Sequence, residues 1–173
     1  ALIGQVKKII QPSNVYYSKP QVELSKKLCA ITGPDKKVFF ANSGTEAIEA
    51  AVKLARKYSK EKFSDRRFKI ISFYKSFHGR TLGALSATAQ EEKQKIFEPL
   101  VEGFDYAVLN DIDSVMKKID DCTCAVLVEP IQGEGGINIA GKNFMEKLRM
   151  ICTEKNILLI LDEVQTGFGR TGN

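Results

Sequence analysis

Two short stretches of the chain, residues 124–128 and 157–161, are apolar at every position. A strand with one face in water alternates apolar and polar side chains, so an uninterrupted apolar run indicates a strand that is buried on both faces. Stretches with helical periodicity separate these runs from further strands expected at residues 38–41, 68–73 and 106–109. The alternation predicts an α/β fold with a mainly parallel central sheet that helices cover on both faces.

The expected helices are recognised by their apolar faces and by the residues that begin or end them. They lie at residues 2–10 (ending before Pro12), 20–31 (starting at Pro20), 45–58, 82–85, 111–119 (with Asp111 as cap) and 144–151.

The chain has 173 residues, of which 43% are hydrophobic, and this length can bury one sizeable core without disulfides or a structural metal. No apolar run approaches the roughly 18 to 20 residues of a membrane span, and the amphipathic first residues are unlike a signal peptide. We therefore expect a cytoplasmic protein with no membrane partner.

The formal net charge of +5 comes from basic residues that are scattered among acidic ones, so no nucleic acid partner is expected. The four cysteines form no C-x-x-C pair, and the chain has one histidine. We expect structural thiols and no metal site.

The residues that can carry chemistry follow the expected strands. In open parallel sheets, ligands bind beyond the carboxyl ends of the strands, so the loops that begin after residues 41, 73, 128 and 161 should meet at one edge. In the first loop, Ser43, Gly44 and Thr45 offer hydroxyls and a close backbone approach at a helix N-terminus, which suits a phosphate. A capping box of Ser43 and Glu46 explains the same pattern and is the commoner structure.

Asp162 follows five apolar residues, so its carboxylate should be partly buried and should require a cation or several donors. A helix cap or a structural ion pair would meet this requirement as well. Gln165 can donate to an oxygen, and Val164 offers an apolar face.

Phe77 can stack on a flat ligand, although core packing is the commoner role of a phenylalanine, and Arg80 can bind a carboxylate. His78 has no Ser, Cys or metal partner in its motif, so we expect no catalytic role for it. Glu129 and Glu134 lie in a stretch whose glycines suggest backbone close to a ligand or a mobile loop. Paired carboxylates occur in glycosidases, but the nearby anion site and arginine argue against that class.

Four stretches of the sequence together resemble the class III pyridoxal phosphate-dependent aminotransferases. They are FANSGTEA at residues 40–47, SFHGRT at 76–81, EPIQGEGG at 129–136 and LDEVQTGFGRTG at 161–172. These motifs occur in the order of the family and span nearly the whole chain. The string NVYYSKPQ at residues 14–21 further resembles the acetylornithine branch of the family, in which Val15 is a mild departure.

The resemblance implies pyridoxal 5'-phosphate (PLP) as cofactor. In the family pattern, Ser43, Gly44 and Thr45 match the loop that holds the cofactor phosphate. Phe77 and Val164 match the residues on the two faces of the pyridine ring.

Two further positions match groups that bond polar atoms of the cofactor. Asp162 matches the carboxylate that pairs with the ring nitrogen and keeps it protonated. Gln165 matches the group that bonds the phenolic oxygen.

Three positions match the part of the family pattern that binds substrate. Arg80 matches a binder of substrate carboxylate, and Glu134 matches the acid that masks a second arginine. Glu129 lies near the cofactor in the family, and its role stays open.

The fold implied by the resemblance is that of the fold type I, aspartate aminotransferase-like, PLP-dependent transferases. Residues 1–173 are expected to form the central part of the large PLP-binding domain. The N-terminal arm, the Schiff-base lysine and the C-terminal small domain of the family pattern are expected to lie outside these residues, so the chain alone should be inactive.

The implied reaction transfers the terminal amine of N-acetylornithine, or of a related ω-amino substrate, to 2-oxoglutarate, as in arginine biosynthesis. Ornithine and 4-aminobutyrate aminotransferases share the four motifs and remain alternatives. The substrates are an amino acid and a 2-oxo acid, and the parent enzyme is expected to be a homodimer.

Two other classes of protein share single features with this sequence. A nucleotide-hydrolysing protein is disfavoured because no G-x-x-x-x-G-K-[ST] motif follows any strand. A non-catalytic binding or assembly module stays open because the lysine is missing.

Overall fold

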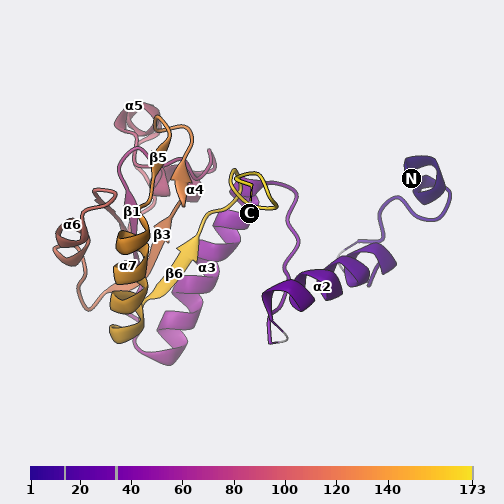
Figure 1. Cartoon of the computed structure of the whole chain (residues 1–173), viewed down its shortest axis with the longest axis horizontal. Helices are drawn as coiled ribbons and strands as arrows, with labels where there is room; N and C mark the ends of the chain where they lie inside the picture. Colours follow the sequence, from indigo (N-terminus) through magenta and orange to yellow (C-terminus); the bar gives the residue numbers. More distant parts are fainter. Residues whose placement is uncertain (14, 34, 173) are drawn as a thin grey trace. The chain divides into compact units, whose positions relative to one another are not determined.

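The computed structural model describes residues 1–13, 15–33 and 35–172, and the chain divides into two compact units, Ala1–Phe40 and Ala41–Asn173 (Figure 1). Asn14, part of the string at residues 14–21, lies outside the described residues. The first unit contains helices α1 (Leu2–Val6) and α2 (Lys19–Thr32). Pro20 lies in the first turn of α2, as predicted. Helix α1 is shorter than expected because it buries no residue and has no side-chain cap, and so short a helix is marginal without packing.

A four-stranded parallel sheet forms the centre of the second unit. Its strands are β1 (Lys69–Phe73), β2 (Phe104–Ala107), β3 (Thr123–Val128) and β6 (Leu158–Leu161). The order across the sheet is β2-β1-β3-β6, and every neighbouring pair is parallel. All six residues of β3 are buried, as the apolar run at residues 124–128 predicts. The same prediction for the run at residues 157–161 is wrong, because β6 is only partly buried. The parallel sheet is confirmed.

Helices cover both faces of this sheet (Figure 1). Helices α3 (Gly44–Lys62) and α4 (Leu82–Ala87) contribute to one apolar cluster, and α6 (Ile112–Met116) and α7 (Lys142–Glu154) contribute to the other. Ile70 belongs to the first cluster and the next residue, Ile71, to the second, because successive side chains of a strand point to opposite faces.

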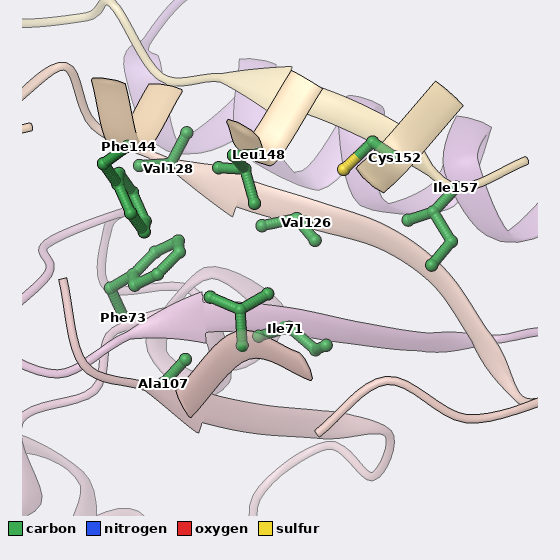
Figure 2. Close-up of a cluster of buried hydrophobic side chains, with 10 residues drawn as sticks. Ile71, Phe73, Ala107, Val126, Val128, Phe144, Leu148, Cys152 and Ile157 are labelled. Carbon is green, nitrogen blue, oxygen red and sulfur yellow. The ribbon is translucent and has the colours of Figure 1, made fainter. Parts of the chain in front are cut away.

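Helix α7 packs on the second face through residues spaced four apart, Phe144, Leu148 and Cys152. Figure 2 shows these side chains directed toward the strands, with Phe144 against Phe73. The two rings meet edge to face, with centroids 5.8 Å apart and an interplanar angle of 80°.

Two predicted helix caps are present. Ser43 is the N-cap of α3, and its hydroxyl accepts a hydrogen bond of 3.3 Å from the backbone N–H of Glu46. Asp111 caps α6 by accepting from the N–H of Ser114 at 3.0 Å. These bonds satisfy donors that have no partner within the helix.

The prediction of a strand at residues 38–41 is wrong. This segment has no strand pairing in the described part of the chain, and Phe39 is 75% exposed. A strand requires a neighbour to satisfy its backbone, and an apolar sequence alone cannot supply one.

Several short elements were not predicted. Strands β4 (Ile131–Gln132) and β5 (Asn138–Ile139) form an antiparallel pair, and α5 (Glu91–Gln94) continues into a single 3₁₀ turn, η1 (Lys95–Phe97). Within the described ranges, no helix is both long and apolar enough to cross a membrane.

Candidate active site

A cavity of about 320 Å³ lies beyond the carboxyl ends of the neighbouring strands β1, β3 and β6. The chain passes from β1 outward to β2 and then places β3 on the opposite side of β1, so the topology reverses between β1 and β3. Open parallel sheets bind ligands at such a reversal. The cavity is lined by Gly44, Thr45, Phe77, His78, Gly79, Arg80, Glu129, Ile131, Asp162, Val164 and Gln165. The four predicted loops therefore do meet.

The N-terminus of α3 supplies the polar end of this cavity. The backbone N–H groups of Gly44 and Thr45 lie in the first turn, where a helix offers no acceptor, and neither donates to another group in the described part of the chain. The capping bond from Ser43 uses the N–H of Glu46, and the Glu46 carboxylate accepts from the N–H of Asn42 at 2.6 Å. The cap therefore coexists with free donors that suit an anion.

Gly44 is also required by packing against Val164. A Cβ on Gly44 would lie 2.6 Å from Cγ1 of Val164, which is closer than carbon atoms approach. The valine side chain is thus set directly against the helix start, on the border of the cavity.

Asp162 continues β6 by one residue, since its N–H donates to the carbonyl oxygen of Val128 at 2.9 Å. One carboxylate oxygen, Oδ1, accepts from the N–H of Val164 at 3.0 Å. The other, Oδ2, lies 2.7 Å from Nδ1 of His78. The side chains of His78 and Asp162 are only 0% and 5% exposed, so the pair is removed from solvent.

His78, for which the sequence analysis expected no catalytic role, lines the cavity as the partner of Asp162. Because an ionised carboxylate can only accept, Nδ1 is the ring nitrogen that carries the proton toward Asp162. The other nitrogen, Nε2, is buried without a partner among the described residues. His78 therefore orients the Asp162 carboxylate, and the available signal was the demand of a buried aspartate for a donor.

Phe77 lines the cavity and belongs to neither apolar cluster, so core packing is not its role. The guanidinium of Arg80 lies 5.8 Å from the centre of its ring, and the ammonium of Lys93 lies 4.9 Å from it. Both distances are in the range of cation–π attraction. Of the two cations near the ring of Phe77, Arg80 also lines the cavity and Lys93 does not.

Glu129 lies directly after β3 and accepts a hydrogen bond of 3.0 Å from the N–H of Phe77. The residue is 4% exposed. Burial raises the pKa of its carboxyl to about 7, and the nearby charges of Asp162 and Glu134 act in the same direction, while the bond from Phe77 opposes them. Glu129 thus holds the backbone of Phe77 and titrates near neutral pH.

Glu134 and Gln165 lie at the outer side of the site. Glu134 is exposed between β4 and β5 and does not line the cavity, whereas Gln165 does. A Cβ on Gly133 would be 2.7 Å from Oε1 of Gln165, and one on Gly135 would overlap the carbonyl oxygen of Lys75. These glycines allow close packing within the protein.

Comparison with known proteins settles the family. The model of the family described as aminotransferase class-III matches residues 1–173. The chain belongs to the class III aminotransferases. This confirms the family predicted from the four motifs.

Two similar curated relatives are acetylornithine aminotransferases. An acetylornithine aminotransferase from Aquifex aeolicus strain VF5 is 57% identical over 172 residues, covering 99% of this chain and 46% of the relative. Another from Methanocaldococcus jannaschii is 48% identical over 172 residues, covering 99% of this chain and 43% of the relative. The chain thus spans less than half of the length of these class III enzymes.

A solved class III structure supports the fold and the cofactor. The ornithine aminotransferase of Toxoplasma gondii, with PLP at partial occupancy in its active site, has a TM-score of 0.91 and 29% identity, and the match covers 99% of this chain and 41% of that chain. PLP is the cofactor of the family. The cavity has matching chemistry: free amides for a phosphate, an apolar and an aromatic side chain for a ring, and a buried carboxylate for a ring nitrogen.

Proposed function

We propose that residues 1–173 supply the cofactor cradle and part of the substrate site of a PLP-dependent aminotransferase, as the central part of its large domain. One observation carries this proposal. A single cavity joins the first amides of α3, Phe77, Val164 and the buried Asp162, which come from three separate motifs. The reactive lysine would come from a segment outside residues 1–173.

The first step for the chain is to hold the cofactor. Ser43, Gly44 and Thr45 would bind the phosphate through backbone N–H groups and hydroxyls, with the helix dipole favouring the negative charge. Phe77 and Val164 would contact the two faces of the ring, and Gln165 would donate to the phenolic oxygen. When bound, PLP supplies an electron sink for the carbon that exchanges its amino group.

Asp162 would keep a proton on the ring nitrogen. An ionised partner favours the protonated form of a base, and a charge-assisted hydrogen bond contributes roughly 1.5 to 3 kcal/mol. The bonds from His78 and Val164 fix the carboxylate in one orientation. The electron-withdrawing power of the ring thus depends on residues of this chain.

Arg80 would bind a substrate carboxylate in a bidentate manner, since it stands at the open edge of the cavity. Glu134 would mask a second arginine that lies outside residues 1–173. Glu129 would help to hold the loop that carries Phe77, through the hydrogen bond to its backbone.

For the substrate we propose N-acetylornithine, with 2-oxoglutarate as the acceptor and arginine biosynthesis as the pathway. The names of the curated relatives and the string at residues 14–21 support this choice. Ornithine and 4-aminobutyrate are the alternative amines. The parent enzyme is proposed to be a cytoplasmic homodimer.

Steady-state kinetics of the full-length protein with the three amines and 2-oxoglutarate test this proposal. We expect kcat/KM to be at least tenfold higher for N-acetylornithine than for ornithine or 4-aminobutyrate. A preference for either alternative would reject the substrate, and absence of transamination with all three would reject the function.

A further inference from the structure

A carboxylate on α3 binds the loop that carries Arg80. Oε1 of Glu49 accepts three hydrogen bonds: 2.5 Å from the hydroxyl of Thr81, 3.0 Å from the N–H of Gly83 and 3.2 Å from the N–H of Ala84. These amides lie in the first turn of α4, where the helix offers them no acceptor. Glu49 thus replaces the missing cap of α4 from a different helix.

The same loop contacts α3 at a second point, one turn earlier. Thr45 and Glu49 are four residues apart and share one face of α3. The hydroxyls of Thr45 and Thr81 are 3.3 Å apart. Gly79 lies so close to Thr45 that a Cβ at this position would overlap the hydroxyl oxygen of Thr45. The loop is therefore attached on both sides of Arg80.

Arg80 itself has few contacts that could fix it. Its residue is exposed, and in the described part of the chain its guanidinium forms no ion pair and lies only near the ring of Phe77. A flexible side chain of this kind is placed mainly by its backbone. The backbone is placed by Glu49 and Thr45, and Thr45 also belongs to the proposed phosphate loop.

We propose that Glu49 is a positioning residue, which fixes Arg80 relative to the N-terminus of α3 through Thr81 and the first turn of α4. The inference rests on the proposed function, because it assigns Arg80 to a substrate carboxylate. The distance between the cofactor phosphate and the substrate carboxylate is then set by one helix, α3, and by the carboxylate of Glu49.

The test uses the full-length protein with PLP and three variants that weaken the contact in different ways. Glu49→Gln keeps the side-chain length but removes the charge. Thr81→Val removes the hydroxyl, and Thr81→Ser is its matched control because it keeps the hydroxyl. We expect Glu49→Gln and Thr81→Val to raise the KM for 2-oxoglutarate about tenfold, with kcat and the affinity for PLP within about twofold, and Thr81→Ser to have little effect.

Each change is then repeated together with Arg80→Ala. If Glu49 acts through Arg80, neither Glu49→Gln nor Thr81→Val changes the KM further in that background. An unchanged KM in the single variants, or an equal rise with and without Arg80, overturns the inference. A variant that lowers the thermal midpoint but leaves KM unchanged counts against it as well, since a purely structural bond gives that result. Lack of transamination by the unmodified protein would instead reject the proposed function.

Discussion

Glu129 makes the stability of the protein dependent on pH. Its carboxyl has a folded-state pKa of about 7 instead of 4.5, so between these values the folded state binds more protons than the unfolded state. The contribution of Glu129 to the free energy of unfolding should therefore be most favourable below pH 4.5, decrease as the pH rises toward 7, and level off above it. Between the two pKa values the decrease is about 1.4 kcal/mol for each pH unit.

Urea unfolding of the cofactor-free protein at pH 5 and pH 8 measures this effect. Glu129→Gln should remove this decrease, so the variant gains stability relative to the unmodified protein as pH rises. Glu154→Gln, at an exposed glutamate at the end of α7, is the matched control and should leave the decrease unchanged. An equal pH dependence in the Glu129→Gln variant would contradict the prediction.

His78 should determine the affinity for the cofactor through Asp162. His78→Ala removes the donor to Oδ2 and should weaken PLP binding by about tenfold or more, because a charge-assisted hydrogen bond is lost. His78→Asn can place an amide N–H near the position of Nδ1 and should retain part of the affinity. Fluorescence titration with PLP compares the variants with the unmodified protein. Equal affinity of all these proteins for PLP would show that the hydrogen bond between His78 and Asp162 does not contribute to cofactor binding.

Sequence patterns identified Asp162 as a buried carboxylate but not the group that faces it. His78 and Asp162 are 84 positions apart, and their loops come together only because β1 and β6 lie on either side of β3. Local signals were sufficient for Ser43 and Asp111, because a helix cap depends on residues within one turn. Contacts between residues on different strands cannot be predicted from residues that lie within one helical turn of each other in the sequence.

At the level of elements, the contact between α7 and the sheet should carry much of the stability. Leu148 is fully buried in the cluster of Figure 2, so Leu148→Ala should reduce the free energy of unfolding by roughly 2–5 kcal/mol. Met150→Ala, two residues further on the same helix, is the matched control because Met150 is 70% exposed and should change stability by less than about 0.5 kcal/mol. If urea unfolding showed the same loss of unfolding free energy for both variants, the contact of Leu148 with the sheet would not be a main source of stability.

A helix or strand could be predicted where the pattern of its residues indicates whether they are buried or exposed. The apolar runs at residues 124–128 and 157–161 both form strands of the parallel sheet, but only β3 is buried throughout. Strand β6 lies at the edge of the described sheet, and its Leu161 is 48% exposed, so its burial on both faces was wrongly predicted. Residues 38–41 have a similar composition but no pairing within the described chain. The pair β4 and β5 was missed because two-residue strands show no periodicity.

At the level of the whole molecule, the order β2-β1-β3-β6 places three motifs on one edge of the sheet, and α3 adds the fourth. All the residues of the proposed cradle lie within this chain, which spans less than half the length of the two acetylornithine aminotransferases it resembles. We therefore expect residues 1–173 to hold the cofactor, and catalysis to require the remainder of the protein.

A titration of the chain with PLP, followed by absorbance and fluorescence, tests the proposed cradle most directly. We predict saturable binding that Asp162→Asn weakens at least tenfold, together with no preference for ATP and Mg²⁺. Binding of ATP with Mg²⁺ in preference to PLP, or no saturable binding of PLP, would contradict the cradle.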